Sequence, residues 1–421
     1  MTHTSRFLRA AVQAAWCTAI VLAVPSRALP QDPGKVATPG GYDAGYLVFK
    51  SADGAFQYWL DGRIQVDAAS YFGSNNKLGS GTDIRRARLG WTATLFHDWH
   101  GEIDIDFASN EVEMKDMWLG YQGFKNTMIK VGNYKPPFGL ETLTSSKFIT
   151  FVERSYADNF SPDRNIGLGV VRWGDRWYAT VGVFGQAAGT PDATGNDESR
   201  AYMGRFVWTP VKTDNALLHL GIAANTRTPD AASGADTNTV RFRARPETWI
   251  SKARFLTTGK IRSVDRTNSF GGELASTLGA ATMQAEFVQV NVERLAGLDA
   301  PKFRAGYVQM SYFLTGERRP YTMEDAEFDR VIPKTKNGAW EIAARWSKMD
   351  LNDPAAGVDI AGGSAVNYTL GVNWYINANF KWMLNWVSVN NDNNAKPDLG
   401  TAPFTVGDKF SILQTRFALA F

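Results

Sequence analysis

The chain has 421 residues, of which 44% are hydrophobic and 13% aromatic, and its formal net charge at pH 7 is only +3. Its single cysteine, Cys17, lies in an N-terminal apolar run; if that run is removed, disulfides, thiol catalysis and cysteine-based metal sites are excluded. No later stretch is long and apolar enough for a transmembrane helix, so a membrane crossing would have to use strands, in which only every second residue is apolar.

The first residues have the layout of a secretory signal. Two arginines precede an apolar run over 10–24, a proline ends the run, and small residues around Ala28 offer a cleavage site. We predict a cleaved signal peptide over 1–28, and then a flexible periplasmic leader over 29–45 that is rich in proline and glycine.

From residue 46 to residue 421 strand follows strand without a sign of a domain boundary, which predicts one domain over 46–421. A long irregular segment, 135–164, interrupts the series. The predicted strands cover 56–71, 84–97, 99–109, 115–122, 127–134, 167–173, 177–185, 200–208, 217–226, 240–245, 270–278, 282–290, 303–314, 339–349, 367–376, 380–389 and 410–421.

The strands have one apolar face and one polar face. Leu89 and Trp91 alternate with Arg88 and Thr92, and the last strand ends on an aromatic residue, Phe421. A water-soluble sandwich would bury the apolar faces, but no amphipathic helix could supply the second layer of so long a sheet. The alternative exposes the apolar faces to lipid, where only a closed barrel pairs every backbone amide. The pattern therefore predicts an all-β fold, a transmembrane antiparallel β-barrel of about sixteen strands with a wet interior.

Three arginines share one face of the predicted strand 240–245: Arg241, Arg243 and Arg245. An arginine facing lipid at the middle of a bilayer costs about 2 to 4 kcal/mol, so all three should face water. Their planar forks suit oxyanions, and like charges in a narrow channel attract anions. Solvated loop or rim residues, or contacts within a trimer, are alternative roles for them.

Several short motifs resemble the phosphate-selective porins O and P. Their order and spacing match from the first strand to the last, and they are Asp61-Gly62-Arg63-Ile64-Gln65-Val66-Asp67, Arg85-Arg86-Ala87, Phe138-Gly139-Leu140-Glu141, Thr144-Ser145-Ser146-Lys147, Thr315-Gly316-Glu317, Gly338-Ala339-Trp340-Glu341 and Leu370-Gly371-Val372-Asn373-Trp374-Tyr375. The resemblance implies a sixteen-stranded barrel, usually a homotrimer, whose third loop, here 135–164, folds inward and narrows the pore.

The resemblance also implies an anion path made of a ladder of arginines and a constriction. The matching positions are Arg63, Arg85, Arg86, Arg154, Arg243 and Arg245, with Ser145 as a constriction serine and Asp116 as a constriction acid. Alternation places Arg85 on the face opposite Arg86, unless it lies above the membrane or at a bulge.

The chain departs from the family where lysines are expected. Thr142 follows the Phe-Gly-Leu-Glu motif, where phosphate-selective members carry a lysine, and Thr322, Glu327 and Ile332 replace lysines farther on. We therefore predict a channel that prefers anions but binds phosphate more weakly than the family's type members.

Other functions were weighed against the channel. An enzyme is disfavoured because His97 and His100 lie at a predicted short turn and the acidic row from Glu102 to Asp106 balances arginines. An adhesin, a plugged receptor and a nucleic-acid binder find no support, and no cofactor or metal is expected. The remaining alternative is a general porin for small hydrophilic solutes. The expected partners are phosphate, chloride or organic anions and outer-membrane lipid, and the expected location is the bacterial outer membrane.

Overall fold

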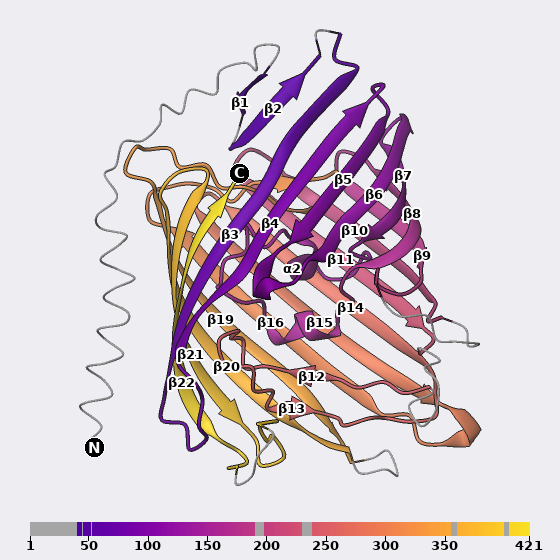
Figure 1. Ribbon diagram of the computed structural model, residues 1–421, viewed down its shortest axis with the longest axis vertical. Coiled ribbons are helices and arrows are strands. Elements are labelled where there is room, and N and C mark those ends of the chain that lie inside the picture. Colours follow the sequence, from indigo (N-terminus) through magenta and orange to yellow (C-terminus); the bar gives the residue numbers. More distant parts are fainter. Residues whose placement is uncertain are drawn as a thin grey trace.

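The protein is an antiparallel β-barrel of 16 strands, seen in a computed structural model that describes residues 40–43, 45–51, 53–189, 198–229, 238–354, 360–399 and 404–421 (Figure 1). Each barrel strand pairs with the barrel strands before and after it, and the last strand pairs with the first. The barrel strands are β3 (Phe56–Phe72), β4 (Gly81–Leu95), β5 (Trp99–Asp106), β6 (Glu113–Phe124), β7 (Thr127–Tyr134), β8 (Asn165–Trp173), β9 (Trp177–Phe184), β10 (Ala201–Lys212), β11 (Ala216–Arg227), β14 (Val264–Leu278), β15 (Ala281–Arg294), β16 (Lys302–Phe313), β19 (Ala339–Asp353), β20 (Ile360–Tyr375), β21 (Phe380–Asn391) and β22 (Lys409–Ala420).

Smaller elements lie in the connections and at the N-terminal edge. They are β1 (Gly40–Asp43), β2 (Tyr46–Lys50), β12 (Arg243–Ala244), β13 (Leu256–Thr257), β17 (Tyr321–Thr322), β18 (Glu327–Phe328), the helix α2 (Leu140–Leu143) and the 3-10 turns η1 (Ala108–Asn110), η2 (Tyr156–Phe160) and η4 (Leu295–Gly297). The hairpin of β1 and β2 extends the sheet from β3, so the last residues of the predicted leader form a paired strand. The predicted signal peptide lies outside the described residues.

The predicted fold class is confirmed, and all but one of the predicted strands correspond to barrel strands. The prediction of a strand over 240–245 is wrong. Arg243 and Ala244 pair with Thr257 and Leu256 in a two-stranded ladder, and Val240 forms a single bridge with Ile261, all within the connection between β11 and β14. Arginines do alternate with apolar residues in this segment, but the segment pairs with a neighbouring stretch of the same connection rather than with a barrel strand.

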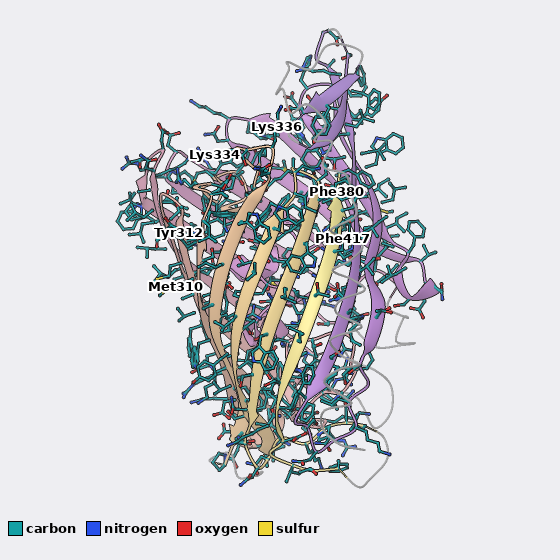
Figure 2. The ribbon with its side chains drawn as sticks, turned by 90° about the vertical axis from the view of Figure 1, so that its left-hand side faces the viewer. Met310, Tyr312, Lys334, Lys336, Phe380 and Phe417 are labelled. Atoms are coloured by element: carbon teal, nitrogen blue, oxygen red, sulfur yellow. The ribbon has the colours of Figure 1, made fainter. Side chains whose placement is uncertain are left out.

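The two faces of the strands differ in exposure as the alternation predicts. On β4, Leu89 is 48% exposed and Trp91 is 54% exposed, whereas Arg86, on the other face, is 5% exposed. Figure 2 shows Met310 and Tyr312 of β16 on the outer surface, where both are more than half exposed. Large apolar side chains cover the outside of the barrel and charged side chains line the inside, so the outer surface is suited to contact with membrane lipid.

The final strand closes the barrel tightly. The backbone of Phe421 exchanges two hydrogen bonds with Gly62 of β3, N–H to O at 3.1 Å and O to N–H at 2.8 Å. A Cβ atom on Gly62 would stand 2.4 Å from the ring of Phe421, so a larger residue here would require the terminal ring to move. The aromatic chain end is therefore held by the first barrel strand.

The connections differ in length at the two ends of the barrel. At one end, here called the turn side, they are short, except for 314–338; at the other, the loop side, 135–164 and 228–263 are the longest. Short turns on one side and long loops on the other are expected for an outer-membrane barrel. Among the described residues, no helix is long and apolar enough to cross a membrane.

Candidate functional site

A large cavity inside the barrel brings most of the predicted site residues together. This central cavity has a volume of about 1180 Å³ and is lined by β3 to β9, the segment 135–164 and the segment 321–329. Its lining includes Arg63, Arg85, Arg86, Asp116, Thr142, Ser145 and Arg154. Residues that are far apart in sequence meet here because alternate positions of every strand point inward.

Both members of the Arg85-Arg86 pair reach the cavity because the strand pairing shifts between them. Gln65 pairs with Arg86, but the next residue of β3, Val66, pairs with Ile84, so Arg85 is the extra residue of a β-bulge. Arg86 donates a hydrogen bond to Gln65 Oε1 at 2.8 Å, and Arg85 forms two hydrogen bonds with Glu153, at 2.8 and 3.2 Å. The bulge thus turns a pair that would straddle the sheet into two inward-facing arginines.

Arg63 lies between the wall of the barrel and the segment 135–164. Its guanidinium donates to Ser146 Oγ at 3.0 Å and to Ser145 Oγ at 3.4 Å, and it lies 3.3 Å from Asp104 Oδ2. Asp104 also lies 3.5 Å from Arg88. Two members of the acidic row on β5, Asp104 and Asp106, are therefore paired with arginines, whereas Glu102 accepts a hydrogen bond from Trp118. Arg63 is already partly neutralised.

The segment 135–164 is held by side chains from the inner faces of distant strands. The backbone N–H of Val152 donates to Asn385 Oδ1 at 2.8 Å, and that of Tyr156 donates to Ser347 Oγ at 3.0 Å. The side chain of Tyr156 is fully buried, and it belongs to an apolar cluster that includes inner-face residues of β15, β16 and β19. Hydrogen bonds and apolar packing together therefore fix the position of the segment.

Arg345 connects both long loop-side connections to the wall. It is 3% exposed; its two terminal nitrogens lie 3.3 Å from Glu141 Oε1 and 2.7 Å from Glu247 Oε2. Glu141 belongs to 135–164, and Glu247 belongs to 228–263. A buried arginine with two carboxylate partners makes this junction costly to open.

Thr142 lies among charged groups although it carries no charge. Its hydroxyl donates to Asp158 Oδ1 at 2.7 Å, and Arg154 lies 3.7 Å from the same oxygen. Lys135 donates through Nζ to the carbonyl oxygens of Thr142 and Leu143. An ammonium group is therefore present beside Thr142, but it is engaged with backbone oxygens.

Asp116 is paired rather than free. Arg164 donates to Asp116 Oδ2 through Nε at 2.8 Å and through a terminal nitrogen at 2.5 Å. Carboxylate oxygens of Glu102, Asp104 and Asp116 lie within 4.8 Å of one another, a spacing that could hold a cation. Since arginines already engage two of these three carboxylates, a metal ion would have to compete with them.

A second, smaller cavity on the loop side gathers arginines. This arginine cavity has a volume of about 320 Å³, adjoins the central cavity, and is lined by seven arginines and three acidic residues. The arginines are Arg85, Arg86, Arg154, Arg241, Arg243, Arg245 and Arg254. All three acids have arginine partners: Glu153 pairs with Arg85 of the lining and with Arg416, Asp158 pairs with Arg154 of the lining, and Glu247 pairs with Arg345.

Five of these arginines lack a carboxylate partner. The structure describes no ion pair for Arg86, which donates to Gln65, or for Arg241, Arg243, Arg245 and Arg254. Burial, and then the positive charges of Arg254 and Arg241, lower the pKa of Arg243. Guanidinium groups stay protonated despite such shifts, so the cavity keeps an uncompensated positive charge. Arg241, Arg243 and Arg245, which were predicted to face water, line this cavity from a loop connection rather than from a barrel strand.

The turn side of the central cavity is lined by acidic side chains, in contrast to the arginine cavity on the loop side. The connection 314–338 contributes Glu324, Asp325, Glu327 and Asp329 to its lining, and none of them forms an ion pair with a described residue. Arg205 fixes this connection by donating to the carbonyl oxygens of Asp325 at 3.3 Å and Ala326 at 2.9 Å. Sequence reasoning noted the missing lysines here but did not foresee that four carboxylates would face the cavity.

Several other lining residues were not predicted from the sequence. They are Arg88, Lys115, Lys130, Lys135, Arg164, Trp249 and Arg254. Arg164 could have been found as the basic residue directly before β8, where the long segment returns to the wall. Trp249 and Arg254 lie in an irregular connection, where no periodic signal shows which way a side chain points.

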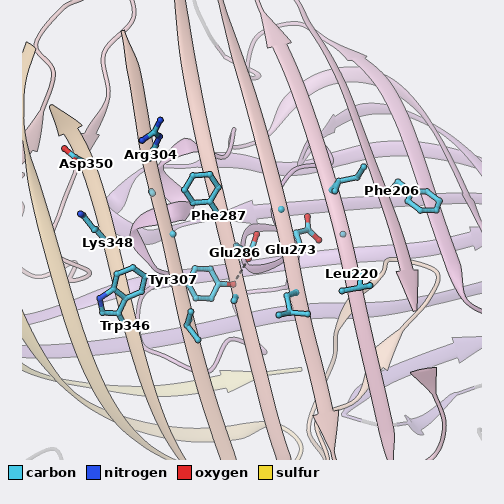
Figure 3. Close-up of a pocket in the computed structure, with 18 of the residues that line it drawn as sticks. Phe206, Leu220, Glu273, Glu286, Phe287, Arg304, Tyr307, Trp346, Lys348 and Asp350 are labelled. Atoms are coloured by element: carbon cyan, nitrogen blue, oxygen red, sulfur yellow. Dashed lines mark hydrogen bonds between the residues drawn. The ribbon is translucent and has the colours of Figure 1, made fainter. Parts of the chain in front are cut away.

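A third hollow lies outside the channel. Figure 3 shows it on the outward face of β10 to β19, where Phe206, Leu220, Phe287 and Trp346 surround a volume of about 850 Å³. Glu286 and Tyr307 belong to the inner face of the same strands and are hydrogen-bonded to each other at 2.5 Å. This apolar hollow faces the membrane, so it is not part of the permeation path.

A closed antiparallel barrel of 16 strands, apolar outside and charged inside, defines an outer-membrane porin barrel. The chain belongs to the family of phosphate-selective porins O and P, whose model matches residues 59–421. This family places the protein in the bacterial outer membrane.

Individual relatives agree with this assignment. Porin O of Pseudomonas aeruginosa is 29% identical over 420 residues, which cover 89% of this chain and 92% of the relative. An uncharacterised protein of Caulobacter vibrioides is 28% identical over 355 residues, covering 80% of this chain and 69% of the relative.

Solved structures share the fold. OmpT of Vibrio cholerae matches with a TM-score of 0.54 and 10% identity over 89% of this chain and 100% of that one. An anion-selective porin from Comamonas acidovorans matches with a TM-score of 0.51 and 12% identity over 87% of this chain and 100% of that one.

Proposed function

We propose that this porin forms a water-filled, anion-preferring channel for passive diffusion of phosphate, chloride or similar small anions. The observation that carries the proposal is the arginine cavity, where five arginines without a carboxylate partner among the described residues line a space that adjoins the central cavity. Uncompensated positive charge between low-dielectric walls concentrates anions, and several moderate sites in a row let them leave again. A channel explains this arrangement without catalysis, so we propose no enzymatic activity, cofactor or metal.

The path that we propose runs past Arg243 and Arg245 to Arg85, Arg86 and Arg154, and then to Arg63 and Ser145. We further propose that the segment 135–164 narrows the channel, with Thr142 and Asp116 at the constriction. Three contacts support this role: Asn385, Ser347 and Arg345 all hold the segment from inner faces of the wall. Because Thr142 adds no charge, phosphate should bind more weakly than to a constriction that carries a free lysine.

Two further features complete the proposal. The segment 1–28 acts as a cleaved signal peptide that exports the chain, and the mature porin assembles as a homotrimer. Amino-terminal sequencing of the mature protein tests the first, with residue 29 expected at the start. Native mass spectrometry in detergent tests the second.

Planar-bilayer recording of the purified porin tests the function. In a potassium chloride gradient the reversal potential should show that chloride permeates more readily than potassium, and added phosphate should reduce the chloride current in the millimolar range or above. A zero or cation-selective reversal potential would refute an anion-preferring channel.

A general porin with little ion selectivity is the second candidate. The observation that favours it is the carboxylate-lined turn side of the central cavity, since negative charge there opposes the arginines. Equal permeability of chloride and potassium, with free passage of neutral sugars of matching size, would establish this alternative.

A further inference from the structure

Trp249 lies where the two cavities meet, and it lines both of them. Three cations surround its indole ring. Arg85 Cζ lies 3.8 Å from the ring centroid, Lys252 Nζ lies 4.0 Å from it, and Arg245 Cζ lies 4.4 Å from it. The indole Nε1 donates to Asp83 Oδ2 at 3.0 Å, which fixes the orientation of the ring.

The two arginines depend on this ring to different degrees. Arg85 is also held by its two hydrogen bonds to Glu153. Arg245 has no carboxylate partner among the described residues, and its other contact is a long hydrogen bond of 3.4 Å from Nε to the carbonyl oxygen of Lys252. Arg245 therefore relies on the indole more than Arg85 does.

An aromatic face holds a cation in a way that a carboxylate cannot. A carboxylate would cancel the positive charge and occupy the donor edge of the guanidinium fork. The indole face attracts the cation through its quadrupole but carries no net charge, and it leaves the N–H edges free for another oxygen. Neighbouring arginines repel one another. An aromatic partner offsets this repulsion without neutralising the arginines, so their positive charge stays available to attract anions.

We propose that Trp249 is a positioning residue that holds Arg245 beside Arg85 at the junction of the two cavities while leaving both guanidinium groups charged. The proposal rests on the anion channel proposed above. It assigns the junction a preference for oxyanions, phosphate among them, because the terminal N–H groups of Arg245 can donate in pairs to an anion passing from the arginine cavity to the central cavity. Arg85 adds only the terminal nitrogen that Glu153 does not engage.

Substitution of the ring tests the proposal. We compare Trp249→Leu, which removes the aromatic face, with Trp249→Phe, which keeps a smaller one, and measure how strongly inorganic phosphate blocks the chloride current. Loss of a cation–π contact should weaken the block by about fivefold in Trp249→Leu, and the change should be under about twofold in Trp249→Phe. Trp346→Leu, which removes an outward-facing indole, should match the unmodified porin.

A second variant separates positioning from a general effect on folding. Arg245→Gln should weaken the phosphate block about as much as Trp249→Leu does. The block in the double variant should be no weaker than the block in either single variant, because both substitutions remove the same interaction. Equal block in Trp249→Leu and the unmodified porin would overturn the proposal, as would Trp249→Phe behaving like Trp249→Leu, or fully additive losses in the double variant. If the unmodified porin itself prefers cations, the proposed function fails, whatever these variants do.

Discussion

The carboxylates on the turn side of the central cavity should limit the anion preference of this porin. Glu324 and Asp325 line the cavity, are exposed within it, and have no ion-pair partner among the described residues. A double substitution, Glu324→Gln with Asp325→Asn, removes both charges and keeps the side-chain shapes. We expect this variant to prefer anions more strongly than the unmodified porin.

The size of the effect follows from the dimensions of the cavity. A sphere of 1180 Å³ has a radius of about 6.5 Å, and at that distance in water two unit charges interact by about 0.6 kcal/mol. Screening at 0.1 M salt reduces this to about 0.3 kcal/mol for each carboxylate. Removal of two carboxylates should therefore raise the local anion concentration about threefold, and the chloride-to-potassium permeability ratio at least as much.

Reversal potentials in a potassium chloride gradient measure this ratio directly. Asp175→Asn with Asp214→Asn serves as the control, because it also removes two carboxylates from turn-side connections, but neither residue lines the central cavity. The control should leave the ratio unchanged. If Glu324→Gln with Asp325→Asn shows the same ratio as the control, then the carboxylates of 314–338 do not face the permeation path.

Three further predictions follow from the same geometry. Thr142→Lys adds a charge beside Lys135 and should strengthen phosphate block of the chloride current about two- to fivefold, whereas Thr142→Met should not; equal block in both would exclude a charge effect. Arg243→Gln with Arg254→Gln should lower the chloride-to-potassium ratio more at 0.1 M than at 1 M salt, since screening weakens the contribution of these charges; an effect independent of salt would contradict an electrostatic role. Arg416→Met removes a fully buried arginine with 2.7 Å contacts to Asp67 and Glu153 and should lower the free energy of unfolding in lipid vesicles by about 3 to 5 kcal/mol, measured by urea titration; a loss below 1 kcal/mol would show that the pair is not strongly coupled.

The sequence by itself determined the architecture of this protein. Alternation along each strand is a local property, and because side chains of a strand point to opposite faces, it decides which residues face lipid and which face water. Leu89, Trp91 and Arg86 are placed as the alternation predicts, and the aromatic chain end pairs with Gly62 as a closing strand should. The resemblance of the sequence to the porin family also identified Thr142 and Glu327 as positions where lysines are expected.

Only the tertiary structure decided how the charges are distributed along the channel. The register shift opposite Gln65 brings Arg85 inward, and no local pattern around Arg85 reports how β3 pairs with β4. The same is true of Trp249, which contacts Arg85 although the two residues are far apart along the chain. In the long connections the chain has no period, so the direction of a side chain is set by contacts with distant strands, and those contacts appear only once the barrel has closed.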